Sequence, residues 1–343
     1  MDSWFILAEQ TPKFWGGFRF PLATGLVALL ITWGLTPVVR KLAFQYGAVD
    51  DPKRDDRRIH KEPLPRWGGV AIFIGIAVAI LAVLPFAYPK TTAFPPYLIG
   101  MLLIGLLLVV SGMLDDLFQY SAKIQLLMLL GAGIAIQFFS SPLGQIQIKT
   151  IGVPFTDKYI PLLWAAIPLT AIYIFIVTKT MDTIDGVDGL ASGIAAISAS
   201  TLMVIAVYEG QPRVAIIAGA IAGACMGFLH HNYNPAKIIM GTGGAYILGF
   251  MLACLSIVGA VKTAAALTLL IPMFVFGVPI MDAIQVVIRR KLSGVPITQA
   301  DKRHLHHQLL KRGLSQRQTV WVLYLAAAAL CGTLIFIILT SYV

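Results

Sequence analysis

Carboxylate side chains recur in this 343-residue chain where long apolar stretches end. The segment GMLDDLFQ carries Asp115 and Asp116 side by side. The segment MDTIDGVDGLASG carries Asp182, Asp185 and Asp188 at a three-residue spacing, which in a helical turn places them on one broad face. Clustered carboxylates repel one another unless they share a cation or a proton, so the pattern indicates Mg²⁺ or diphosphate chemistry. A solvated helix end and a structural salt bridge are the alternatives.

The segment HHNYNPAKIIMGTGGAY joins polar side chains to a glycine-rich turn. Asn232 and Lys237 in this segment are candidates for substrate binding. Residues 241–245 are all small, and at a helix start they could offer backbone N–H groups to a phosphate. The same run would also permit tight helix packing, and the sequence leaves both alternatives open.

Two basic segments contribute the remaining candidates. In ADKRHLHHQLLKRG the candidates for gripping a phosphate are Arg303, His304, His306 and His307. Histidines surrounded by Lys and Arg suit an anion better than a second cation. In DDPKRDDRRIHKEPLPRWGG, His60 and Lys61 could also reach phosphate. A basic, solvated loop is the alternative for both segments.

The elements that position these residues follow from composition. Hydrophobic residues make up 58% of the chain and charged residues 12%, and the mean hydropathy is +0.82. Soluble domains have about 45–50% hydrophobic and about 25% charged residues, so a soluble globular protein is excluded. Ten stretches without Asp, Glu, Lys or Arg are long enough to cross about 30 Å of hydrocarbon, where backbone must be helical. These are residues 20–39, 68–89, 91–114, 124–148, 159–178, 189–208, 214–229, 238–261, 263–281 and 318–343.

We therefore predict an all-α, polytopic integral membrane protein, with one transmembrane domain over residues 1–343. Ten spans sort the loops into two sets, and one set carries 19 of the 26 Lys and Arg residues. By the positive-inside rule this set is cytoplasmic, in a cell inner (plasma) membrane protein. Its loops are about residues 40–67, 115–123, 179–188, 230–237 and 282–317.

The same loops hold 12 of the 16 acidic residues and all six histidines. This distribution predicts an active site at the cytoplasmic membrane surface. A transporter would carry ionisable groups near the middle of the membrane. The net charge of +10 is explained by topology, so no nucleic-acid partner is expected.

Six segments in this order resemble the polyprenyl-phosphate N-acetylhexosamine-1-phosphate transferases, an integral membrane family of glycosyltransferase group 4. They are D-x-P…H…P-x-x-G-G, GMLDD, DGVDGLASG, N-x-x-P-A-K, GVPIMDAI and HLHH-x-L, between about residues 47 and 317. The resemblance implies transfer of a sugar 1-phosphate from a UDP-sugar to a lipid phosphate, with release of UMP. It also implies Mg²⁺, with Mn²⁺ as a substitute.

HLHHQLLKRG resembles the branch that uses UDP-N-acetylglucosamine and undecaprenyl phosphate for O-antigen, common-antigen or teichoic acid linkage units. The branch that uses UDP-N-acetylmuramoyl-pentapeptide usually has three consecutive histidines, and it is kept as the alternative. A flippase-like or non-catalytic membrane protein is a second alternative. A homodimer is kept as a hypothesis.

Two positions depart from the family pattern. The family usually has a metal-binding Asp where this chain has Thr242, and an Asn where this chain has Asp182. We predict that one carboxylate has moved within a single metal site, so that Asp182 and Thr242 are the metal ligands. The competing interpretation is a weakened or inactive enzyme.

Overall fold

The computed structural model describes residues 16–50, 62–89, 94–152, 159–260, 274–292 and 304–341. The fold is all-α, as predicted. Its helices are α2 (Arg19–Gln45), α3 (Gly68–Ala87), α4 (Pro96–Phe118), α5 (Ala122–Ala135), η2 (Ile136–Phe138), η3 (Leu163–Ala165), α6 (Ala166–Ile184), α7 (Leu190–Tyr208), α8 (Pro212–Asn232), α9 (Gly241–Ala260), α11 (Gly277–Leu292), α12 (Leu305–Lys311) and α13 (Gln316–Ser341). Two antiparallel ribbons complete it, β1 (Val49–Asp50) with β2 (Leu64–Pro65) and β3 (Thr150–Gly152) with β4 (Tyr159–Pro161).

Eight helices in the described part of the chain are long and apolar enough to cross a membrane. They confirm eight of the ten predicted spans. The fourth prediction, residues 124–148, was too long, because the apolar helix covers Ala122–Phe138 and then ends. Pro142 and Gly144 follow, and a bridge between Ser141 and Gly144 closes a turn there. Most of the ninth predicted span, 263–281, lies outside the described residues; α11 continues past its end to Leu292.

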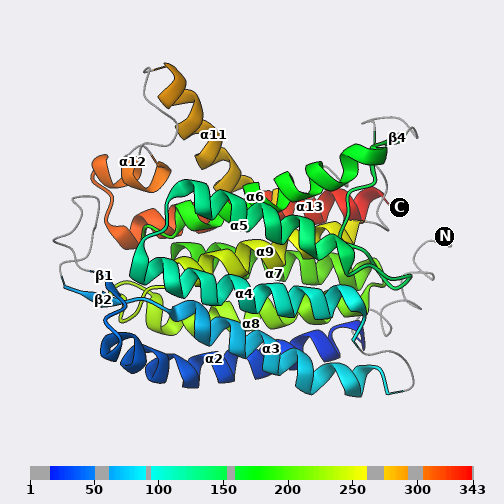
Figure 1. Ribbon diagram of the computed structural model, residues 1–343, viewed down its shortest axis with the longest axis horizontal. Coiled ribbons are helices and arrows are strands. Elements are labelled where there is room, and N and C mark those ends of the chain that lie inside the picture. The colour runs from blue at the N-terminus through cyan, green and yellow to red at the C-terminus, as the bar shows by residue number, and fades with distance from the viewer. Residues whose placement is uncertain are drawn as a thin grey trace, which may run out of the picture.

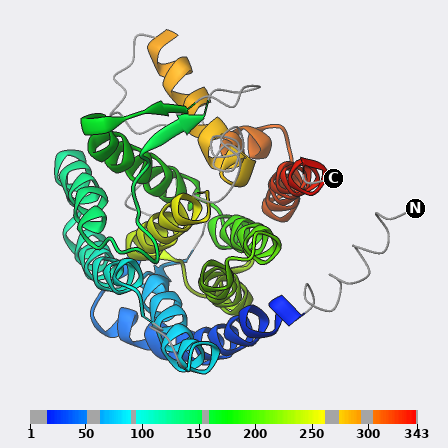
Figure 2. The ribbon, with the colours of Figure 1, turned by 90° about the vertical axis from the view of Figure 1, so that its right-hand side faces the viewer.

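Helix α9 lies inside the bundle, where it packs against α3, α4, α6, α7 and α8 (Figure 2). Its apolar window is completely buried, whereas the windows of α2 and α13 are 28% buried. The outer helices present large apolar side chains outward, including Leu26 on α2 and Leu325 on α13. This is the pattern expected for a protein whose outer surface contacts lipid.

Helices α2 and α8 touch through glycine. Gly219, Gly223 and Gly227 recur every fourth residue on α8, and their faces meet the backbone of α2. A Cβ on Gly223 would lie 1.9 Å from the carbonyl oxygen of Gly25. Small residues at this spacing let two membrane helices approach closely, which is a main source of attraction in lipid.

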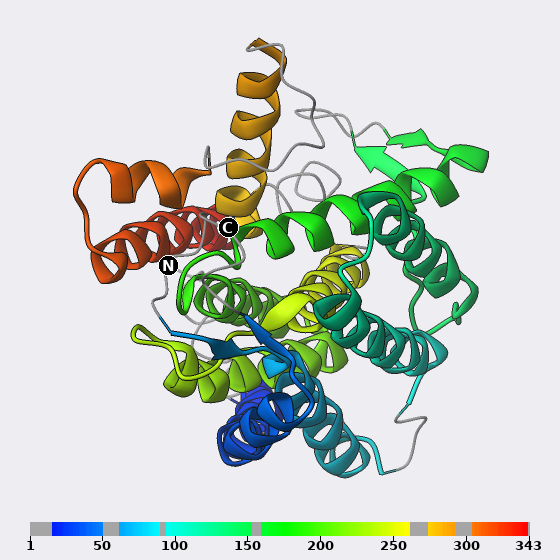
Figure 3. The same ribbon diagram turned by 60° about the vertical axis from the view of Figure 1, so that its left-hand side comes forward.

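The two ends of the bundle differ in chemistry. In Figure 1, β1, β2 and α12 lie at one end, and β4 and the end of α13 lie at the other. The ends of α4, α6 and α8 and the starts of α7 and α9 meet at the first end, which Figure 3 brings forward. We call it the carboxylate end, because it holds Asp115, Asp116, Asp182, Asp185 and Asp188. The predicted sorting of the loops to one end is thus confirmed for the described residues.

Candidate active site

Asp116 joins the end of α4 to the start of α9. Its Oδ1 accepts hydrogen bonds from the Thr242 backbone N–H at 3.2 Å and from the Thr242 hydroxyl at 2.9 Å. The Arg66 Nε lies 3.3 Å from the same oxygen as an ion pair. The other oxygen, Oδ2, is buried and has no hydrogen-bond partner among the described residues. Asp116 therefore keeps one acceptor available inside the protein.

Glycine contacts bring these groups together. A Cβ on Gly112, one turn before Asp116, would lie 2.2 Å from the Gly243 Cα. A Cβ on Gly69 would lie 2.2 Å from the Gly244 backbone N. The N–H of Gly69 also donates to the Met240 carbonyl at 2.9 Å. Of the two alternatives for the glycine-rich turn, the structure favours tight packing of α3 and α4 against α9.

A second chain of contacts runs from Asp115 to Asp182. The Gln125 side-chain amide donates to Asp115 Oδ2 at 3.1 Å, and its Oε1 accepts from the Lys179 ammonium at 2.8 Å. Lys179 also pairs with Asp182 Oδ2 at 2.6 Å. Asp115 Oδ1 accepts from the Tyr120 backbone N–H at 2.6 Å, which holds the turn after α4. The contacts thus link α4, α5 and α6.

Tyr246 lies on α9, one helical turn after Thr242. Its side chain is fully buried, and its hydroxyl has no hydrogen-bond partner among the described residues. The Asp182, Asp115 and Asp116 carboxylates all act on it electrostatically. The Lys179 Nζ is 5.9 Å from the centre of its ring. Tyr246 is therefore a buried residue within electrostatic range of the carboxylates of both α4 and α6.

Asp185 and Asp188 occupy different settings in the turn between α6 and α7. Burial raises the pKa of the Asp185 carboxyl well above its ordinary value, and repulsion from Asp182 adds to the rise. Asp188 Oδ2 accepts hydrogen bonds from Asn234 Nδ2 at 2.9 Å and from the Ala236 backbone N–H at 3.1 Å. Asp188 thus anchors the segment after α8, whereas Asp185 is the carboxyl that resists ionisation.

The Asn232 side chain is buried and makes three hydrogen bonds. Its Oδ1 accepts from the Gly189 N–H at 3.0 Å and the Ser192 hydroxyl at 3.1 Å, and its Nδ2 donates to the Ile238 carbonyl at 3.0 Å. Its predicted contact with substrate stays a prediction, and its contacts here hold the start of α7 against the end of α8.

The histidine segment is held by a residue that we did not single out from the sequence. Asp282, on α11, accepts from the Leu305 N–H at 2.6 Å and lies 2.7 Å from His304 Nδ1, so it caps α12. His306 packs over the turn between α6 and α7, where a Cβ on Gly186 would lie 2.9 Å from its Nε2. Burial, together with the nearby His307 and His304 rings, lowers the pKa of His306 to about 3, although the Asp282 carboxylate acts to raise it. His306 is thus a neutral hydrogen-bonding ring and not a positive charge.

The other predicted substrate-binding residues are placed as follows. His307 adjoins His306, with ring centres 4.4 Å apart. The Lys237 side chain is exposed, and its backbone N–H donates to the His231 carbonyl. His60, Lys61 and Arg303 lie outside the described residues.

The predicted metal ligands are already engaged with other side chains, Asp182 with Lys179 and Thr242 with Asp116. Among the described residues, no three His, Cys, Asp or Glu side chains cluster closely enough to hold a metal alone. Mg²⁺ is commonly bound by one or two carboxylates together with substrate phosphates and water. The unpartnered Asp116 Oδ2 fits that mode of binding.

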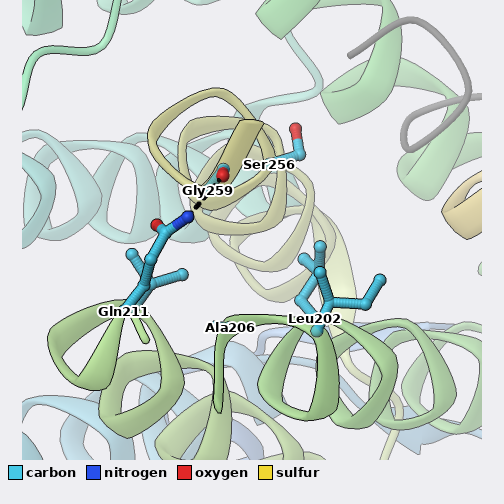
Figure 4. Close-up of a pocket in the computed structure, with 7 residues that line it drawn as sticks. Leu202, Ala206, Gln211, Ser256 and Gly259 are labelled. Carbon is cyan, nitrogen blue, oxygen red and sulfur yellow. Dashed lines mark hydrogen bonds between the residues drawn. The ribbon is translucent and has the colours of Figure 1, made fainter. Parts of the chain in front are cut away.

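A small, mostly apolar pocket between α7, α8 and α9 lies away from this site (Figure 4). Gln211, which begins α8, closes it by donating from Nε2 to the Gly259 carbonyl at 2.8 Å. Gln211 and Gly259 belong to the opposite end of α8 and α9, so this pocket plays no part in the chemistry of the carboxylate end.

Sequence reasoning missed Gln125 and Tyr246, quoted Asp282 only within the motif GVPIMDAI, and considered Lys179 only as a salt-bridge partner. Lys179 stands three residues before Asp182, a helical spacing that signals an ion pair. Tyr246 stands four residues after Thr242, on the same face of the helix. Gln125 carries no signal of its own, because its partners come from two other helices.

Comparison with known proteins agrees with this arrangement. The model of glycosyl transferase family 4 matches residues 98–260, which include α4, α6, α7 and α9. The chain belongs to this family. It is 38% identical over 300 residues, 88% of this chain and 80% of the relative, to a probable undecaprenyl-phosphate N-acetylglucosaminyl 1-phosphate transferase of Bacillus subtilis.

Two further relatives carry related names. A decaprenyl-phosphate N-acetylglucosaminephosphotransferase of Mycolicibacterium smegmatis is 32% identical, over 95% of this chain and 84% of the relative. An undecaprenyl-phosphate alpha-N-acetylglucosaminyl 1-phosphate transferase of Escherichia coli is 25% identical, over 91% and 82%.

Proposed function

We propose that this protein transfers N-acetylglucosamine 1-phosphate from UDP-N-acetylglucosamine to a polyprenyl phosphate such as undecaprenyl phosphate. The relatives are named for this activity, and 88% of the chain aligns with the one from Bacillus subtilis. The observation that carries the proposal is the meeting of Asp115 and Asp116 from α4 with Asp182 from α6 at one end of the bundle. The names of the relatives give no support to the muramoyl-pentapeptide or flippase alternatives.

In the proposed reaction, an oxygen of the lipid phosphate attacks the phosphorus that bears the sugar. The bond from this phosphorus to the bridging oxygen breaks, and UMP leaves with that oxygen. A phosphate dianion is already a nucleophile, so the need for a general base is small. The residues have to hold two anions in line and to exclude competing water.

Asp116 and Asp115 would position the lipid phosphate, with Arg66 balancing the charge of Asp116. His304 and His307 would hold the phosphates of the donor, and neutral His306 would contribute a hydrogen bond. Asp185 and Asp188 would order the turn that faces the nucleotide. We assign the two phosphates to different groups because Asp115 and Asp116 lie on α4, whereas the histidine segment forms α12.

A magnesium ion is implied by the family, and Asp116 Oδ2, Asp182 and Thr242 are the residues that would hold it. When bound, Mg²⁺ neutralises charge on the diphosphate and on departing UMP. The chain of contacts from Asp115, the neighbour of Asp116, through Gln125 and Lys179 to Asp182 supports one metal site. The competing explanation for an aspartate at position 182 is its ion pair with Lys179.

We further propose that the carboxylate end faces the cytoplasm from the inner membrane, because basic residues are concentrated there. Cysteine labelling of a residue near Lys311 should succeed only after the membrane is opened. Labelling from outside intact cells would reverse this orientation. A homodimer remains a hypothesis.

The activity is tested with purified protein in detergent, UDP-N-acetylglucosamine and undecaprenyl phosphate. We expect release of UMP that requires Mg²⁺, is lost with a chelator, and falls at least about tenfold in Asp116→Asn. UDP-N-acetylmuramoyl-pentapeptide serves as the competing donor. Activity only with that donor, or none with either, would overturn the proposal.

The metal assignment is tested by a double-mutant cycle. Asp182→Asn should abolish turnover, and adding Thr242→Asp should restore part of it if the two positions share one ion. Binding of Mn²⁺, followed by electron paramagnetic resonance, provides a readout that does not depend on turnover. If the double mutant turns over no faster than Asp182→Asn, residues 182 and 242 do not share one metal ion.

A further inference from the structure

Lys179 lies among the carboxylates with part of its hydrogen-bonding capacity unused. An ammonium group has three N–H donors. Within the described residues, Lys179 Nζ donates to Gln125 Oε1 at 2.8 Å and Asp182 Oδ2 at 2.6 Å. One N–H is left without an acceptor among these residues. The side chain is 34% exposed, so an incoming molecule can reach it.

The position of the ammonium group is fixed by its neighbours. Gln125 uses its NH₂ group on Asp115 and its oxygen on Lys179, so the orientation of its amide is determined by both partners. The ring of Tyr246 lies on another side of the ammonium, 5.9 Å away. A cation held this way loses little freedom on binding a further anion, which favours affinity.

The surrounding charge makes such a cation necessary. Asp115, Asp116 and Asp182 contribute negative charge at the carboxylate end. A phosphate that enters this region is repelled unless positive charge meets it. Arg66 is already paired with Asp116 and also lies 3.8 Å from Asp50. Lys179 lies beside Asp182 and, through Gln125, close to Asp115, and it has an N–H to spare within the described part of the chain.

We propose that Lys179 is a phosphate-binding residue of this site, whose third N–H donates to a phosphate oxygen of a substrate. The inference rests on the proposed function and adds to it a residue from α6. The phosphate belongs either to the donor diphosphate or to the lipid phosphate, and these sources are separated by experiment. The competing explanation is that Lys179 only neutralises Asp182.

The test compares Lys179→Met and Lys179→Arg with Lys41→Met. Lys41 is an exposed lysine near the end of α2, so its variant makes the same charge change on a different helix. Binding of UDP is measured by calorimetry in the presence of a chelator, so that neither metal nor turnover enters the result. The KM for undecaprenyl phosphate is measured separately.

If the donor diphosphate is the ligand, Lys179→Met weakens UDP binding by about tenfold or more, as expected for a charge-assisted hydrogen bond. Lys179→Arg then retains most of the affinity, and Lys41→Met matches the wild type. If the lipid phosphate is the ligand, UDP binding is unchanged and the KM for undecaprenyl phosphate rises by about tenfold instead. Either result supports the proposal and names the source.

The double variant Lys179→Met with Asp182→Asn separates phosphate binding from charge neutralisation. If Lys179 binds phosphate, UDP affinity or lipid-phosphate KM stays impaired when both charges are removed. Recovery of the affected constant, or a Lys179→Met that equals Lys41→Met in both measurements, overturns the proposal. Wild-type protein that binds no UDP and releases no UMP would instead defeat the proposed function, and this inference with it.

Discussion

Two glycine-lined helix contacts in this bundle use the same packing and carry different consequences. Between α2 and α8, Gly25 and Gly223 bring two apolar helices into backbone contact. Between α4 and α9, Gly112 and Gly243 do the same, but Asp116 and Thr242 stand next to the contact. Between α2 and α8 the close approach serves packing alone. Between α4 and α9 it also sets the distance between Asp116 and Thr242.

The difference shows how a membrane bundle can position charged groups. Apolar surface gives little attraction between helices that are already in lipid, so close backbone packing has to supply it. At the carboxylate end that packing leaves the Asp116 and Thr242 side chains no freedom to separate. A disturbance of α4–α9 should therefore affect activity, and one of α2–α8 should affect stability.

Among the glycine and threonine variants that test this comparison, the largest effect is expected from Gly112→Ala. The added methyl group would lie 2.2 Å from the Gly243 backbone, so α4 and α9 must move apart and Asp116 shifts relative to Thr242. A displacement of about 1 Å at reacting groups can cost about 100-fold in rate. UMP release should fall by about that factor.

Gly131→Ala is the matched control for Gly112→Ala, because nothing lies within 4 Å of the added methyl group on α5. It should leave the rate unchanged. Equal rates in the two variants would show that the α4–α9 distance does not control the chemistry.

A smaller loss is expected from Thr242→Val, which keeps the shape of the side chain and removes the hydroxyl that donates to Asp116. The rate should fall by about tenfold, the value of one hydrogen bond to a charged group, while the melting temperature changes little. Thr242→Ser keeps the hydroxyl and should stay close to wild type. A fully active Thr242→Val would remove this bond from the mechanism.

Gly223→Ala should act on stability alone. Its methyl group meets the Gly25 carbonyl oxygen at 1.9 Å, and overpacking of this kind costs about 1–3 kcal/mol in the free energy of unfolding. Thermal unfolding in detergent measures this cost, and the rate per folded molecule should be unchanged. Gly34→Ala, an α2 glycine with nothing within 4 Å, is the control. If Gly223→Ala lowered the rate without lowering stability, the α2–α8 contact would not serve packing alone.

The smallest effect concerns pH and belongs to the carboxylate end. The pKa of His306 is about 3 in the folded protein and 6.5 when unfolded, because burial opposes its charge. Below pH 6.5 the unfolded state takes up a proton that the folded state refuses, so stability falls as pH decreases from 6.5 toward 3. His306→Gln should flatten this part of the melting-temperature profile. An unchanged profile would mean that His306 does not contribute to it.

Much of the site could be predicted from the sequence, because its members come from ordered motifs with recognisable residue types. Asp115, Asp116 and Asp182 were found from clustering alone, and the structure brings them together. Lys179 was weighed only as a salt-bridge partner, and Tyr246 and Asp282 were not singled out. Their importance depends on neighbours in other helices, such as the Asp182, Asp115 and Asp116 carboxylates around Tyr246.

The sequence by itself determined that the chain is a bundle of membrane-crossing helices with its charged loops gathered at one end. Hydropathy and charge distribution are properties of residues along the chain, and lipid allows the backbone few other conformations. The clear errors are at residues 139–148 and at Tyr159–Pro161, which forms strand β4, and both arose because a stretch without charges need not be helical throughout.

Only the tertiary structure decided which polar groups are satisfied and which are left available. Thr242 is engaged by Asp116, Asn232 is hydrogen-bonded through both its oxygen and its nitrogen, and Asp116 Oδ2 has no partner in the described chain. A hydrogen bond forms only within about 3.5 Å, and such distances between helices depend on how closely they pack. Here the glycines of α4 and α9 set that separation, and no pattern along a single helix could have specified it.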